Sequence, residues 1–240
     1  AAMVLTDDNF SSIVAAVHEG REIFENIKKY LVYLLAGNLG LVIYLSSVVF
    51  FGTLMGIPSD IIPMTAIQIL FINLICDGFI AVALSTGEPR DPYIMDRKPR
   101  RRDENIFSGQ ILSFIGFAGL WTGLMTLFSL YWAYNTGHTI EEAVAIAFLT
   151  LLFLRFFHAF NCRSIRTSAI VAGPFKNSWL SITLGLNALL AVAIVYLPVF
   201  QRMFRTYSIA LSEWGMILAL GITVVTAMEV YKLIRHHGSR

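Results

Sequence analysis

Long apolar runs separated by short polar segments dominate the pattern along the chain. A helix needs about 20 mostly apolar residues to cross the hydrocarbon core of a membrane. The runs that reach this length cover residues 31–54, 61–85, 107–134, 143–160, 178–200 and 213–233. The pattern therefore predicts an all-α fold, a polytopic membrane bundle of about six transmembrane helices.

Helical periodicity begins before the first of these runs. Residues 9–30 place apolar side chains at helical spacing, and no proline separates them from the first span. A single helix from about Ser11 to Phe51 would be about 60 Å long, roughly twice the thickness of the hydrocarbon core. We expect it to project from the amino end as a cytoplasmic stalk. Gly20 leaves a separate short helix before the membrane as the alternative.

The composition excludes a water-soluble domain. Hydrophobic residues make up 56% of the chain and charged residues 14%, against about 25% charged residues in soluble domains. The formal net charge of +2 is too small to indicate a nucleic-acid partner. The two cysteines, Cys76 and Cys162, lack the spacing of metal ligands, so neither a disulfide framework nor a zinc site is predicted.

The distribution of Lys and Arg predicts the topology. The loops rich in these residues are 86–106 and 161–177, whereas the loops that contain neither are 55–60 and 135–142. Because positive charges are retained on the cytoplasmic side, the first pair of loops and both termini are expected to be cytoplasmic. Arg202 and Arg205 fall on the opposite side and count against this pattern.

Polar residues in the second span indicate a cation site. An ionisable group in mid-membrane is costly, so it needs a partner, water or an ion. Asn73 and Asp77 lie four residues apart, on one face of a helix, and Gly78 would ease local unwinding. Their oxygen atoms suit a hard cation such as Ca²⁺. The alternatives are Asn73 as an interhelical hydrogen-bonding residue and Asp77 as a protonated structural acid. Cys76 remains an uncertain ligand, because thiolates favour softer metals.

Two further spans contain candidate site residues. Asn38 lies among small residues in the first span, where helix packing and ion ligation are equal alternatives. Arg155, in the fourth span, carries a permanent charge. It is either a tethered cation beside Asp77 or a side chain that extends to the cytoplasmic surface. His158 and Asn161, one turn further on, are expected at the interface.

Ordered motifs give the chain a family resemblance. Residues 73–78 read Asn-Leu-Ile-Cys-Asp-Gly, residues 94–100 read Ile-Met-Asp-Arg-Lys-Pro-Arg, and residues 1–10 lead directly into the predicted stalk. With these motifs in this order, the chain resembles the type II P-type cation-transporting ATPases of the calcium-pump kind over nearly its whole length. The resemblance identifies it as the carboxyl-terminal transmembrane region of such a pump, helices five to ten.

The resemblance also implies a domain organisation. Residues 1–30 are the end of the phosphorylation domain and the stalk helix, residues 31–233 the six-helix cation-transporting ATPase C-terminal membrane domain, and residues 234–240 a cytoplasmic tail. The family's Asp-Lys-Thr-Gly-Thr phosphorylation motif is not in the sequence. ATP, Mg²⁺ and enzymatic activity are therefore expected only of the full-length parent. The implied partners are the lipid bilayer, the transported cation and the rest of the pump: the actuator, nucleotide-binding and phosphorylation domains and helices one to four.

The resemblance assigns roles to individual residues. Asn73 and Asp77 match ligands of the transported cation, and Asn38 matches an amide of the preceding helix. Leu41 and Arg155 stand where pumps with two calcium sites have glutamates, so one site is expected to be missing. The implied function is export of one Ca²⁺ per cycle across the plasma membrane. The alternatives are a pump for Mg²⁺, Mn²⁺ or a monovalent ion, and an autonomous non-enzymatic membrane module or channel.

Overall fold

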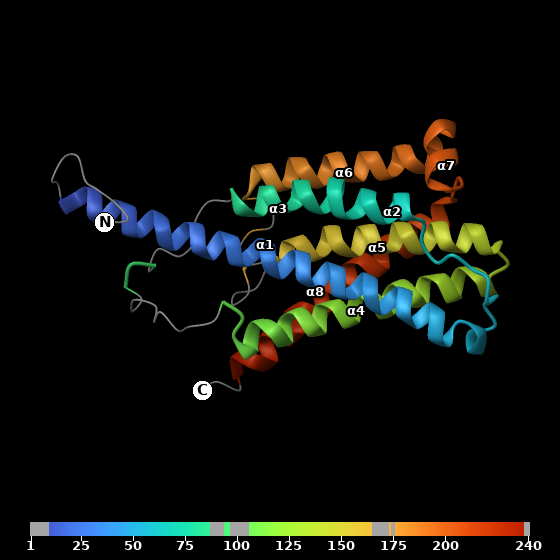
Figure 1. Ribbon diagram of the computed structural model, residues 1–240, viewed down its shortest axis with the longest axis horizontal. Helices are drawn as coiled ribbons and strands as arrows, with labels where there is room; N and C mark the ends of the chain where they lie inside the picture. The colour runs from blue at the N-terminus through green and yellow to red at the C-terminus, as the bar shows by residue number, and fades with distance from the viewer. Residues whose placement is uncertain (1–9, 87–93, 97–105, 165–172, 174–175, 238–240) are drawn as a thin grey trace.

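Long helices lie side by side in a bundle, and the N-terminal part of α1 extends beyond it (Figure 1). The computed structural model describes residues 10–86, 94–96, 106–164, 173 and 176–237. Its elements are α1 (Phe10–Phe51), η1 (Thr53–Met55), α2 (Ala66–Leu70), η2 (Phe71–Cys76), α3 (Asp77–Ser85), α4 (Gly109–Asn135), α5 (Ile140–Cys162), α6 (Ser178–Tyr196), α7 (Pro198–Phe204) and α8 (Leu211–His237). Among the described residues, six helices are long and apolar enough to cross a membrane. The predicted fold class is confirmed.

The first helix is continuous. It comprises 42 residues, and its backbone passes through Gly20 without a break. This excludes a separate short helix before the first span. Arg21 Nη1 on its projecting part donates a hydrogen bond to Ile94 O at 2.7 Å, which joins α1 to the chain between α3 and α4.

The fifth α-helix forms the centre of the bundle. In its apolar stretch 89% of the residues are buried, more than twice the share in any other span. A helix that is apolar on all sides is stable only when other helices surround it. It begins with a capping box, in which the Thr139 hydroxyl accepts from the Glu142 amide and the Glu142 carboxylate accepts from the Thr139 amide.

Glycines allow α1 and α4 to approach closely. A Cβ atom on Gly119 would lie 2.8 Å from Leu39 Cγ, and one on Gly123 would lie 2.8 Å from Ile43 Cβ. Small residues at such contacts let two helix backbones pack closely in a membrane. This contact holds α1 firmly against the bundle.

The second and fifth predicted spans extend beyond the ends of their helices. The second begins at Ala66 instead of residue 61, because Thr65 is extended and caps the helix. The fifth ends at Tyr196 instead of residue 200, since Leu197 is extended and precedes a proline. Pro198 then starts the separate short helix α7. The second span also changes type along its length, from α-helix through the π-helical segment η2 to α3.

Candidate functional site

A buried ion pair lies at the meeting point of three helices. Asp77 is the first residue of α3, directly after η2, and Arg155 belongs to the central helix α5. Arg155 Nη1 donates to Asp77 Oδ2, and the two side chains are 2% and 1% exposed. The Tyr33 hydroxyl of α1 donates to Asp77 Oδ1 at 2.9 Å. Both oxygens of the carboxylate are therefore occupied by protein donors.

The guanidinium group of Arg155 also binds α1. Its Nη2 donates to Gly37 O at 2.6 Å and to Asn38 Oδ1 at 3.3 Å. A Cβ atom on Gly37 would lie only 3.1 Å from Arg155 Cζ, so the glycine leaves the room that the guanidinium fills. Arg155 thus points into the bundle and does not extend to the cytoplasmic surface.

The electrostatics of this pair depend on its surroundings. Removing two charges from water is expensive, and their attraction offsets this only with good geometry and further hydrogen bonds. Asp77 has Tyr33 as a second donor, and Arg155 has Gly37 as a second acceptor. The protein thereby neutralises a mid-membrane carboxylate with a permanent charge of its own.

The second span contains a wider helical turn where we expected unwinding. The segment η2 is π-helical and ends immediately before Asp77, while Gly78 continues in α-helix. Single π-helical turns often occur at functional sites. Asn73 is exposed and forms no hydrogen bond with another described residue, whereas Cys76 is buried. The structure therefore brings Asp77, Arg155 and Asn38 together and leaves Asn73 outside this group.

Sequence reasoning missed Tyr33. Its side chain is buried and its hydroxyl completes the partners of Asp77. A signal was present in the sequence, because a tyrosine buried within an apolar run needs a hydrogen-bond partner. Tyr33 also lies one turn before Gly37 on the same face of α1.

Comparison with known proteins identifies the family of the chain. Residues 61–234 match the family described as "Cation transporting ATPase, C-terminus". The chain belongs to this family. It is 36% identical over 250 residues to Calcium-transporting ATPase 1 of Bacillus cereus, covering 98% of this chain and 27% of that protein. It is 38% identical over 242 residues to a calcium-transporting ATPase of Listeria monocytogenes, covering 98% and 26%.

The chain is also similar to a calcium ATPase from a eukaryote. The endoplasmic reticulum calcium ATPase srcA of Aspergillus fumigatus is 30% identical over 263 residues, with 97% of this chain and 26% of that protein covered. The chain thus spans about a quarter of the length of these relatives. The resemblance to the carboxyl-terminal region of P-type calcium-transporting ATPases is confirmed.

Two further polar residues of this cation-transporting ATPase region lie inside the bundle. His158 and Asn161, which were predicted at the membrane interface, are both buried. The His158 ring stacks on Tyr33 with centroids 6.4 Å apart, and its Nε2 lies 3.2 Å from Cys162 Sγ. Both are buried because α1, α4 and α8 enclose the central helix down to its last turn.

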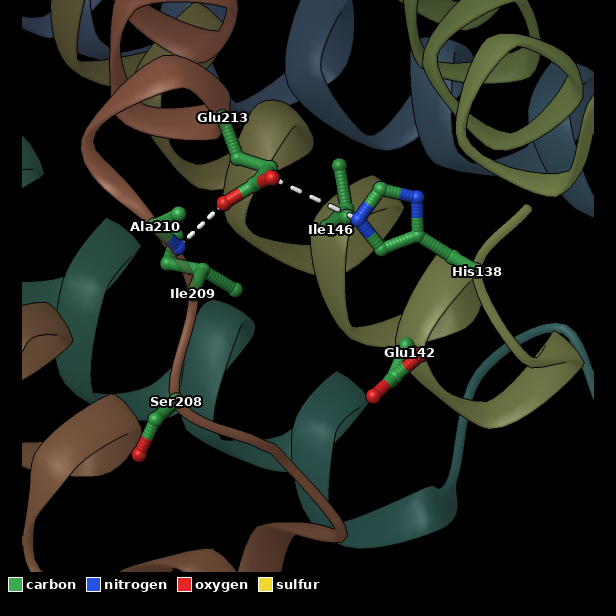
Figure 2. Close-up of a pocket in the computed structure, with 7 residues that line it drawn as sticks. All are labelled: His138, Glu142, Ile146, Ser208, Ile209, Ala210 and Glu213. Carbon is green, nitrogen blue, oxygen red and sulfur yellow. Dashed lines mark hydrogen bonds and ion pairs between the residues drawn. The ribbon is translucent and has the colours of Figure 1, made fainter. Parts of the chain in front are cut away.

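A cavity of about 210 Å³ lies at the opposite end of α5. Figure 2 shows its lining residues, which are His138, Glu142, Ile146, Ser208, Ile209, Ala210 and Glu213. His138 Nε2 and Glu213 Oε1 are 3.4 Å apart. Among the described residues, no group of three or more His, Cys, Asp or Glu side chains could hold a metal ion.

Proposed function

We propose that this chain is the cation-binding membrane part of a P-type calcium-transporting ATPase that exports one Ca²⁺ per cycle. The observation that carries the proposal is the buried Asp77–Arg155 pair in a chain of this family. We infer Ca²⁺ as the transported ion because the relatives are described as calcium-transporting ATPases. Arg155 acts as a tethered cation and replaces a second bound ion.

The ligands of the single Ca²⁺ would be oxygen atoms around Asp77. Asn38 and Asn73 contribute amide oxygens, and both are exposed on this chain, so further ligands can come from the rest of the pump. Cys76 is buried and is the least suited of the predicted ligands. Because Tyr33 and Arg155 occupy the Asp77 carboxylate, Ca²⁺ binding requires at least one of them to withdraw.

The long first helix would couple this exchange to ATP hydrolysis. Its membrane part carries Tyr33, Gly37 and Asn38 against the ion pair, and its projecting part would act as the stalk. A shift of α1 would change all three contacts together. In this arrangement residues 1–30 join the phosphorylation domain, residues 31–233 form the membrane domain, and residues 234–240 are a cytoplasmic tail. Both termini are cytoplasmic and the pump lies in the plasma membrane, with ATP and Mg²⁺ bound by its other domains.

The test uses the full-length pump with phosphoenzyme formation from labelled ATP and with radioactive Ca²⁺ binding. Wild type should bind one Ca²⁺ per phosphorylation site, and Asp77→Asn should abolish Ca²⁺-dependent phosphorylation. Arg155→Ala removes a competitor for the carboxylate, so Ca²⁺ affinity should rise about tenfold, or about 1.4 kcal/mol. Lys176→Ala, which removes an exposed charge, is the control.

Three other results would contradict parts of this proposal. Unchanged affinity and stoichiometry in Arg155→Ala would remove the tethered-cation role. At a fixed Mg²⁺ concentration that saturates ATP, phosphorylation stimulated by added Mn²⁺, by a monovalent ion or by further Mg²⁺, and not by Ca²⁺, would indicate a pump for that cation. A natural product that forms no phosphoenzyme with any of these ions would favour an autonomous membrane module or channel.

A further inference from the structure

The segment between the last two spans, residues 197–210, has an unusual combination of charge and structure. Its helix α7 runs from Pro198 to Phe204 and is followed by the C-cap residue Arg205, whose backbone is left-handed with φ 51°. Figure 1 shows α7 turned across the end of α6, at the end of the bundle remote from the projecting part of α1. We call residues 197–210 the α7 segment.

One face of the α7 segment is fixed to the bundle. Phe204 is buried and packs edge-on against Phe71, with ring centroids 5.1 Å apart. Gln68 Nε2 donates to Phe204 O at 2.8 Å, and the Thr206 hydroxyl donates to Ile194 O at 2.6 Å. The segment is therefore an ordered part of the bundle end, and its outward face has a defined direction.

The outward face is both apolar and cationic. Val199 and Met203 are 76% and 45% exposed, and Arg202 and Arg205 beside them are also exposed. Residues 197–210 contain neither Asp nor Glu. Within the described part of the chain, neither arginine forms an ion pair. The next acid, Glu213, is mostly buried and binds the Ala210 amide and His138 instead.

Aromatic residues place this face at the level of the lipid headgroups. The Tyr196 hydroxyl, at the end of α6, donates to Ile209 O and accepts from Trp214 Nε1, both at 2.9 Å. Tyrosine and tryptophan gather at membrane–water interfaces, with their polar atoms toward water. The α7 segment lies between these two residues in the chain, and the hydrogen bond from Tyr196 to Ile209 holds its end beside this aromatic pair.

We propose that the α7 segment binds the phosphate groups of anionic phospholipids through Arg202 and Arg205, in the leaflet at this end of the bundle. Val199 and Met203 would insert among the adjoining acyl chains, as the apolar face of an interfacial helix does. Arginine suits this role because its planar fork donates two parallel hydrogen bonds to a phosphate. The bound anions also account for two positive charges on the side of the membrane that positive residues normally avoid.

The experiment measures lipid binding to the full-length protein, delipidated in detergent, by native mass spectrometry. Phosphatidylglycerol and phosphatidylcholine are titrated separately, since both carry a phosphate but only the first has a net charge. Wild type should prefer phosphatidylglycerol. The double variant Arg202→Gln/Arg205→Gln should lose about 30-fold in affinity for the tightest phosphatidylglycerol, about fivefold for each arginine. Arg202→Lys/Arg205→Lys should retain part of it.

A matched control removes two exposed charges from the other end of the bundle, in Lys176→Gln/Arg235→Gln. It should retain the tightest phosphatidylglycerol. Equal affinity of wild type for the two lipids, or an unchanged affinity in the α7 double variant with its thermal unfolding intact, would overturn the proposal. A fall in oligomeric mass in that variant at unchanged lipid affinity would instead assign the face to a second copy of the chain.

Discussion

Among the described residues, two pairs of oppositely ionisable side chains join distant parts of the chain, one in the centre of the bundle and one at its end. Arg155 and Asp77 are 2% and 1% exposed, whereas His138 and Glu213, at the cavity in Figure 2, are 25% and 11% exposed. The central pair is closed off from solvent, while the peripheral pair borders a cavity. The difference in burial, more than the difference in charge, decides how much each pair constrains the fold.

The two pairs also differ in what surrounds them. Asp77 accepts a further hydrogen bond from Tyr33 of α1 and Arg155 donates one to Gly37 of α1, so three helices depend on one contact. Glu213 mainly stabilises the start of its own helix, because its carboxylate accepts a hydrogen bond from the Ala210 amide just before α8. The buried pair therefore couples three helices, whereas the peripheral pair joins only the loop before α5 to the first turn of α8.

The largest effect is expected from Asp77→Asn. The variant leaves the Arg155 charge buried without a counter-charge, which should lower the free energy of unfolding by about 3–5 kcal/mol. The double variant Asp77→Asn/Arg155→Met removes both charges and should recover most of this loss. Unfolding by SDS in mixed micelles measures both. Asp60→Asn, an exposed carboxylate, is the control and should change stability little. A double variant as unstable as the single one would contradict the argument.

The transmembrane spans could be predicted from the sequence, but the contacts of the candidate site could not. Apolar runs of membrane length are a one-dimensional signal, so six helices and the continuous α1 could be predicted. A contact of Arg155 with Asp77 could be predicted only as one of two alternatives, the other being an Arg155 side chain that extends to the surface. The reason is that the two residues lie 78 positions apart in the sequence. Tyr33 was missed because nothing in its local pattern shows which carboxylate it meets. The π-helical turns before Asp77 have no signature in apolar periodicity.

A smaller effect is expected from Gly37→Ala, which tests how tightly the Arg155 side chain of the central pair is packed. The new methyl group would lie 3.1 Å from Arg155 Cζ, so the guanidinium must move away from Asp77 or α1 must shift. Overpacking of this kind destabilises by about 1–3 kcal/mol. Gly116→Ala is the matched control, because no atom lies within 4 Å of its new methyl group. The same SDS titration should show the control as stable as wild type or slightly more stable. Equal effects of the two variants would mean that Arg155 has free space around it.

The smallest effect is expected at the peripheral pair, where the two partners should not be equivalent. His138→Gln removes the contact of the imidazole with Glu213, which is partly open to water, so the free energy of unfolding should fall by less than about 1 kcal/mol. Glu213→Gln should lower it further, since a neutral amide is also a weaker acceptor for the Ala210 amide at the start of α8. Thermal unfolding in detergent can rank the two variants against wild type. If His138→Gln were as damaging as Asp77→Asn, burial would not be the variable that separates the two pairs, and the coupling assigned to the central pair would lose its physical basis.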